Sequence, residues 1–159
     1  MWKELIRVLG DINAAYEKIL VLGKEKHKYL VTVKFAELEP ILKEEEKLTD
    51  EIRLLENKRQ GVLIKMAGAN KDLKPGMTMQ ELIAFAPAPL QHTLAVMHKQ
   101  LSGKVAEVVK QNDVNSLLAT GALDAVTKML NKLGGASVDA TYGKGGETVS
   151  HRKKLNINA

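Results

Sequence analysis

The sequence contains no cysteine, few aromatic residues and only 4 prolines among its 159 residues. The absence of cysteine excludes a disulfide-stapled scaffold, a thiol nucleophile and a thiolate metal site. Aromatic residues make up 4% of the chain, which argues against an all-β sandwich or barrel, since such folds use aromatic and β-branched residues in their strands. No apolar run approaches the roughly 18 residues of a membrane-spanning helix, and the first residues show no secretory signal pattern. We therefore expect a cytoplasmic protein without stable membrane insertion.

The charge is basic but evenly distributed. The formal net charge is +5, with 24 lysine and arginine residues against 19 aspartate and glutamate residues. A nucleic-acid surface typically gathers positive charge together with aromatic side chains, whereas the run Arg152-Lys153-Lys154 has no aromatic neighbours. We therefore expect no nucleic-acid partner.

Two stripes of apolar residues predict two long helices. In residues 2–23 the spacing alternates between three and four, as on one face of a helix that lies along another helix, and the same rhythm runs from Leu38 to Val62. Glu45 and Arg59 are polar interruptions of the second stripe. The β-branched run Val31-Thr32-Val33 predicts a turn between the stripes, so we expect a long antiparallel helical hairpin.

A capping box and a glycine pair delimit the rest of the chain. Thr78 and Glu81 have capping-box spacing, which predicts a short helix before the next proline. A third long helix follows and is expected to stop at Gly134-Gly135. The sequence thus predicts an all-α protein, with a coiled-coil-like helical bundle at residues 1–133 and a flexible C-terminal tail at 134–159.

The third helix is apolar over more than one face between Val114 and Leu133. At 100° per residue these side chains span an arc of roughly 220–240°, whereas a helix packed on one side needs a stripe somewhat over about 100° wide. Either other parts of the chain cover the surplus, as around a central helix, or another protein docks on it. We favour docking because only two other long helices are available. The candidate partner-binding residues are Asn112, Asn115, Leu117, Leu118, Ala122, Ala125, Val126, Met129, Leu130 and Leu133. A buried asparagine among them would need a hydrogen-bond partner and would fix the helix register.

Signals for catalysis or for a cofactor are weak. The 4 histidines are isolated, and His92 and His98 would lie about 240° apart around a helix, which excludes a metal pair. The glycine-containing run at residues 143–148 lacks the spacing of a phosphate-binding loop. We predict a binding protein without enzyme activity, metal or cofactor.

Several segments together resemble the FlgN family of flagellar export chaperones. The run Leu38-Glu39-Pro40-Ile41 looks like the start of that family's second helix. The segment Asn112-Asp113-Val114-Asn115-Ser116-Leu117-Leu118 is similar to the family's Asn-x-x-Asn-x-Leu-Leu signature. The segment Thr141-Tyr142-Gly143-Lys144-Gly145-Gly146 looks like its Tyr-x-x-x-Gly ending. Val33-Lys34 stands where the family often has a polar helix cap, so the hairpin turn is expected to depart from the family's.

The resemblance implies a cytoplasmic chaperone for the hook–filament junction proteins FlgK and FlgL. Such a chaperone holds the apolar C-terminal helices of its clients and delivers them to the flagellar type III export gate. Tyr142 is the candidate for the export-gate contact, the alternative being a tail tyrosine with no such role. Two other functions stay open at this stage. One is a structural coiled-coil adaptor that self-associates as a homo-oligomer, and the other is a helical protein that binds nucleic acid.

Overall fold

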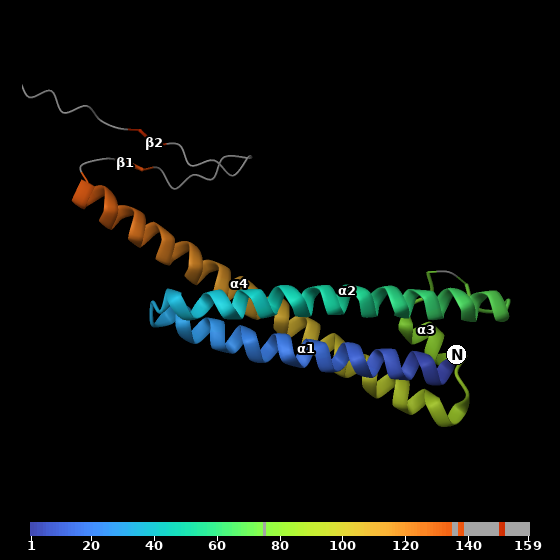
Figure 1. Ribbon diagram of the computed structural model, residues 1–159. Helices are drawn as coiled ribbons and strands as arrows, with labels where there is room; N and C mark the ends of the chain where they lie inside the picture. The colour runs from blue at the N-terminus through green and yellow to red at the C-terminus, as the bar shows by residue number, and fades with distance from the viewer. Residues whose placement is uncertain (75, 135–136, 139–149, 152–159) are drawn as a thin grey trace, which may run out of the picture.

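The computed structural model describes residues 1–74, 76–134, 137–138 and 150–151, and it is a bundle of long helices (Figure 1). The elements in chain order are α1 (Trp2–Val31), the 3-10 helix η1 (Phe35–Glu37), α2 (Leu38–Ala69), α3 (Met79–Ala84), α4 (Ala88–Gly134), β1 (Ser137–Val138) and β2 (Ser150–His151). The hairpin of α1 and α2 is antiparallel, and α4 runs parallel to α1. The predicted all-α fold, with a long hairpin, a short linking helix and a third long helix, is confirmed.

The segment after α4 falls mostly outside the described residues. Within it β1 and β2 pair antiparallel, with Ser137 opposite His151, a pairing that the sequence analysis did not predict. The remainder of the predicted tail, including Tyr142, is not among the described residues.

The central helix of the bundle is α1. It packs against both α2 and α4, whereas no Cα atom in the described part of α2 lies within 8 Å of a Cα atom of α4. Val8 and Ile12 share a core with Leu55 of α2, and Leu5 shares a core with both Val62 of α2 and Leu94 of α4. The alternative in which the third long helix is central is therefore wrong, because α1 has apolar side chains on two faces and takes that place.

The turn of the hairpin is a Schellman motif with an unusual residue. The Lys34 N–H donates to the Tyr29 carbonyl at 2.9 Å, and the Val33 N–H donates to the Leu30 carbonyl at 3.3 Å. Val33 has a φ of 56°, a left-handed conformation that helix ends normally give to glycine. Pro40 follows in the first turn of α2, where its missing N–H removes no helical hydrogen bond.

The short helix α3 fills the space between α2 and α4 at one end of the bundle. The predicted capping box is present: the Thr78 N–H donates to Glu81 Oε2 at 2.7 Å, and the Glu81 N–H donates to Thr78 Oγ1 at 3.3 Å. The bond from the Thr78 N–H lowers the pKa of the Glu81 carboxyl. Leu82 is buried in one cluster with Met66 of α2 and Leu94 of α4, so α3 acts as a short fourth helix there.

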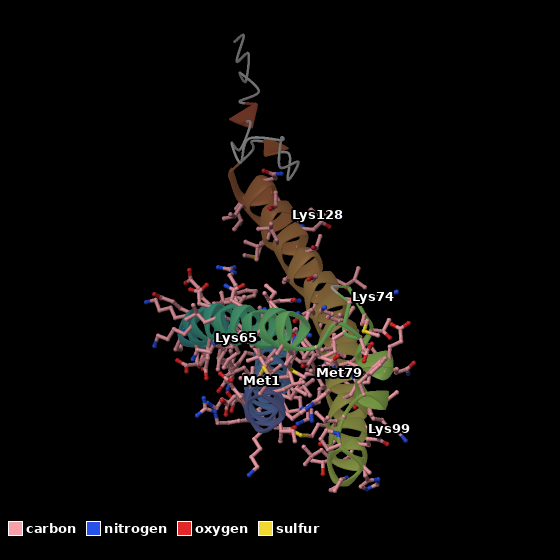
Figure 2. All side chains as sticks on the ribbon, turned by 90° about the vertical axis from the view of Figure 1, so that its right-hand side faces the viewer. Met1, Lys65, Lys74, Met79, Lys99 and Lys128 are labelled. Carbon is pink, nitrogen blue, oxygen red and sulfur yellow. The ribbon has the colours of Figure 1, made fainter. Side chains whose placement is uncertain are left out.

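The other end of α4 extends beyond the hairpin. Figure 2, turned by 90° from Figure 1, shows the part of α4 that carries Lys128 standing clear of α1 and α2. We call residues 88–115 the proximal segment and residues 116–134 the distal segment of α4. The boundary is placed at Asn115, whose side chain forms hydrogen bonds with α1.

Candidate functional site

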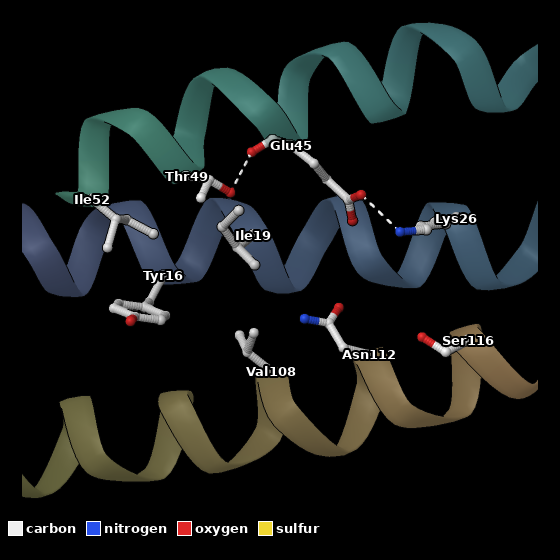
Figure 3. A pocket seen from close by; sticks show the side chains of 9 residues that line it. All are labelled: Tyr16, Ile19, Lys26, Glu45, Thr49, Ile52, Val108, Asn112 and Ser116. Carbon is white, nitrogen blue, oxygen red and sulfur yellow. Dashed lines mark hydrogen bonds and ion pairs between the residues drawn. The ribbon is translucent and has the colours of Figure 1, made fainter. Parts of the chain in front are cut away.

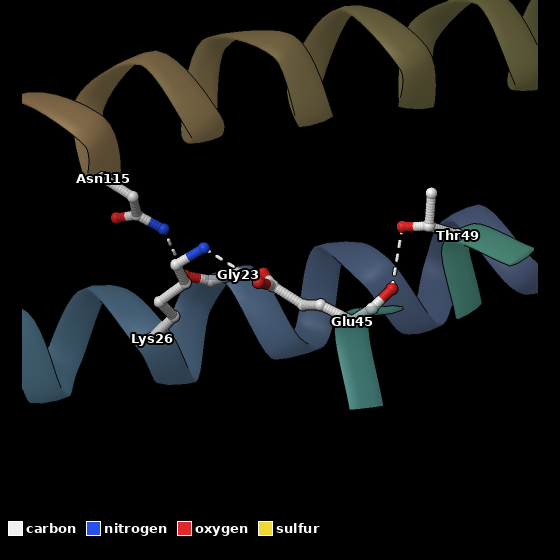
Figure 4. A network of polar contacts seen from close by, with 5 residues as sticks. All are labelled: Gly23, Lys26, Glu45, Thr49 and Asn115. Atoms are coloured by element: carbon white, nitrogen blue, oxygen red, sulfur yellow. Dashed lines mark hydrogen bonds and ion pairs between the residues drawn. The ribbon is translucent and has the colours of Figure 1, made fainter. Parts of the chain in front are cut away.

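Asn115 anchors α4 to α1 at this boundary. Its Nδ2 donates to the Gly23 carbonyl at 2.9 Å (Figure 4). Its Oδ1, which lies 3.1 Å from His27 Nδ1, accepts from that ring. The side chain is only 1% exposed. The absence of a side chain at Gly23 leaves room for the Gln111 side chain of α4, which a Cβ atom there would meet. The buried asparagine thus fixes the register between the two parallel helices.

A second polar contact holds the proximal segment farther back. Asn13 Nδ2 donates to the Met97 carbonyl at 3.2 Å, and Lys104 Nζ donates to the Asn13 carbonyl at 3.2 Å. Lys104 also pairs with Glu17 at 2.9 Å, and the hydrogen bond from Lys104 lowers the pKa of the Glu17 carboxyl. With two polar anchors, the proximal segment has one defined position on α1.

The distal segment exposes most of its large apolar side chains. Leu117 is 75% exposed and Leu133 is 78% exposed. The α4 positions that face α1 continue at spacings of three and four beyond Asn115, through Leu118 and Val126 to Leu133, although α1 ends at Val31. We call the following set of apolar residues the docking face: Leu117, Leu118, Ala122, Ala125, Val126, Met129, Leu130 and Leu133.

Charge in the distal segment is separated from most of this face. Asp124 and Lys128 form an exposed ion pair of 2.7 Å, one helical turn apart. At 100° per residue they lie on the side of the helix opposite Ala122 and Val126. The distal segment is therefore amphipathic. Leu118, Ala122 and Val126 on its apolar side are half-buried, but past the end of α1 no other described helix of this chain stands against that side.

The predicted site residues fall into three groups. The docking-face residues come together on one segment, with Leu117, Met129, Leu130 and Leu133 each more than half exposed. Asn112 is exposed and lies beside the hairpin, whereas Asn115 is buried and bonded within the chain. Tyr142 lies outside the described residues.

A groove that was not predicted from the sequence lies between α2 and α4, and residues of α1 form its floor (Figure 3). One hollow of about 410 Å³ lies between Ile52 of α2 and Val108 of α4, above Tyr16 and Ile19. A second hollow of about 430 Å³ continues toward α3 between Glu56 of α2 and Leu101 and Val105 of α4. We call the two together the α2–α4 groove. Glu45 and Arg59, the two interruptions of the second stripe, both line it, and they are the sequence signal that could have revealed it.

The charged side chains of the groove form ion pairs with one another. Lys26 of α1 pairs with Glu45 of α2 at 2.8 Å, and Arg59 pairs with Glu56 at 2.8 Å. Burial raises the pKa of the Tyr16 hydroxyl between them, and the Glu56 carboxylate adds to that effect. These groups neutralise one another and leave an apolar floor.

The described residues hold neither a metal site nor a membrane span. No group of three or more histidine, aspartate or glutamate side chains there is arranged to hold a metal ion. Among the same residues, no helix is both long and apolar enough to cross a bilayer.

Comparison with known proteins gives one match. No curated protein and no solved structure matches the chain significantly. The family described as FlgN protein matches residues 1–150, which include the helices α1, α2, α3 and α4. The chain therefore belongs to the FlgN family of flagellar export chaperones.

Proposed function

We propose that this protein is a cytoplasmic chaperone that binds the C-terminal helices of the hook–filament junction proteins FlgK and FlgL and delivers them to the flagellar export apparatus. The family consists of chaperones rather than enzymes, and its members bind flagellar hook-associated proteins for export. The observation that supports the finer proposal is the docking face, an exposed apolar side on a helix that two polar anchors hold in place.

The binding mode is a helix laid along a helix. A client segment with its own apolar stripe would lie on the docking face beyond the end of α1, where most of the face is separated from the Asp124–Lys128 ion pair. Burial of roughly 600–800 Å² of apolar surface corresponds to about 15–20 kcal/mol before costs. Ordering of the client and loss of its free motion reduce this value severely, so we expect a net affinity near micromolar. Such a complex releases its client without ATP.

The docking face is tested by placing charge on it. We expect Leu118→Asp combined with Met129→Asp to weaken binding of FlgK and FlgL more than about tenfold, since each carboxylate must be desolvated in the complex. Lys128→Asp is the matched control, because it changes the net charge by the same amount on the charged side of the segment. Titration calorimetry measures the affinities, and circular dichroism checks that the helices persist. Unchanged client affinity in the folded double variant would refute the docking face.

Light scattering separates the chaperone from the structural adaptor. A chaperone forms a new hetero-complex when a junction protein is added. A structural adaptor self-associates as a homo-oligomer and gains no mass from the client. Because the same apolar stripes support both functions, the increase in particle mass when client is added distinguishes them.

The segment after the bundle is proposed to contact the export gate through Tyr142. We expect deletion of residues 136–159 to leave the melting temperature unchanged and to reduce export of FlgK and FlgL. Tyr142→Ala should reproduce the export defect without weakening client binding. A large fall in melting temperature on deletion would instead make this segment part of the folded body.

A further inference from the structure

The α2–α4 groove is the second apolar surface that the bundle leaves without a helix. On α4 it runs from His98 to Ser116, which is about 27 Å at 1.5 Å per residue. Apart from His98, its α4 wall carries side chains that do not ionise, and two of them, Ser102 and Ala106, are small and exposed. Small residues on a wall allow the backbone of a neighbouring helix to approach closely.

The bundle itself shows what fits this space. Toward the N-terminus of α1, the same gap between α2 and α4 is filled by α3, which buries Leu82 against Met66 and Leu94. The filling stops at the N-terminal end of α3, where Met79 lines the groove. The open length is thus the continuation of a position that a helix already occupies.

We propose that the α2–α4 groove binds a second amphipathic helix of the same client whose first helix lies on the docking face. This proposal rests on the proposed chaperone function. The fitting helix is about 18 residues long and has an apolar, uncharged buried stripe, because the ionic groups of the groove are already paired as Lys26–Glu45 and Arg59–Glu56. With this helix in place the hairpin, α4 and the client form a four-helix bundle.

Continuity along α4 identifies the client as the occupant. The groove wall formed by Leu101, Val105, Val108 and Asn112 continues at spacings of three and four through Ala119 to Leu123 and Leu130, which are exposed on the distal segment. One face of α4 therefore leads from the groove onto the surface proposed for the client. Two helices of a single client joined by a short turn bury both surfaces together, and the second helix then binds at a high effective concentration.

The other occupants fit this geometry less well. A second copy would insert its own distal segment, with the two α4 helices antiparallel about Ser116. Yet α1 runs past that level, since His27 bonds Asn115, so the two hairpin turns would meet in the same space. The chain after α4 contains Gly143, Gly145 and Gly146 and few large apolar residues, which is a poor sequence for a groove-filling helix.

Filling the groove with a bulky side chain tests the proposal. We expect Ala106→Trp to weaken FlgK or FlgL binding by about tenfold, because the indole occupies the path of the second helix. Glu107→Trp is the matched control: Glu107 is exposed on the neighbouring position of α4 and does not line the groove, so this variant should bind normally. Normal affinity of a folded Ala106→Trp variant, together with weak binding by the docking-face double variant, would overturn the groove proposal and leave the proposed function standing. Normal affinity of both would overturn both.

A fluorescent probe distinguishes the occupants. Because the chain has no cysteine, Asn112→Cys in the groove wall and Lys110→Cys outside it can each be labelled singly with a polarity-sensitive dye. We expect a blue shift at position 112, and none at position 110, when client is added. A shift at position 112 that grows with protein concentration alone would assign the groove to a second copy. A shift that disappears on deletion of residues 136–159 would assign it to the chain's own C-terminal segment, and either result would overturn the proposal.

Discussion

The proximal and distal segments of α4 are parts of one continuous helix with similar apolar content, yet they meet opposite surroundings. Leu94 in the proximal segment is 0% exposed, whereas Leu133 in the distal segment is 78% exposed. The difference comes from α1, which ends while α4 continues. The exposure of a helix face is thus set by the length of its neighbour as much as by its own sequence.

The largest expected effect tests whether the two segments contribute differently to the free energy of unfolding, as their exposure indicates. We expect Leu94→Ala to lower the free energy of unfolding by about 2–5 kcal/mol, because it opens a cavity in the core shared by α1, α2, α3 and α4. The same substitution at Leu133 should change it by no more than about 0.5 kcal/mol. Urea unfolding followed by circular dichroism measures both. Equal losses would mean that the distal segment is packed in solution, contrary to the comparison.

The boundary between the segments is tested at its anchor. Asn115→Ala leaves the Gly23 carbonyl and His27 without this partner in a buried position, so we expect a loss of about 1–3 kcal/mol. Asn112→Ala removes the same amide one turn earlier, where it is exposed, and should cost no more than about 0.5 kcal/mol. Hydrogen exchange should also show faster opening of α4 near residue 115 in the first variant. If the two variants were equally stable, the anchor would have no energetic role.

The smallest expected effect concerns the turn at the C-terminal end of α1. Val33→Gly should raise the free energy of unfolding by about 1 kcal/mol, because glycine adopts the left-handed conformation without the penalty of a β-branched side chain. Val31→Gly is the control with the opposite sign, since Val31 has helical geometry and glycine there should lower stability by about 0.5–1 kcal/mol. Urea unfolding measures both free energies. A lower stability of Val33→Gly would show that Val33 is not strained at this turn.

Much of the fold could be predicted from local patterns. The three/four spacing of residues 2–23, the capping box at Thr78 and the first-turn position of Pro40 depend on neighbours within a few residues, and the structure agrees with each of them. The exposed apolar surplus of the distal segment was also predicted, because an arc wider than one packing face shows in a single helix.

What could not be predicted depends on distances between helices. The central place of α1 and the gap between α2 and α4 follow from how far apart the two outer helices are held, and no single stripe specifies that distance. Asn115 was grouped with the docking residues because periodicity places it on their face, but only its proximity to Gly23 shows that it is buried. Pairing between distant helices is the missing information in both cases.

The parallel course of α1 and α4 has a consequence during synthesis. The ribosome completes α1, α2 and α3 before it makes the distal segment of α4. The helices against which α4 packs have therefore already been synthesised when Asn115 emerges. The apolar face of the proximal segment can consequently be buried as soon as it is synthesised, which shortens the time during which that face is available to aggregate.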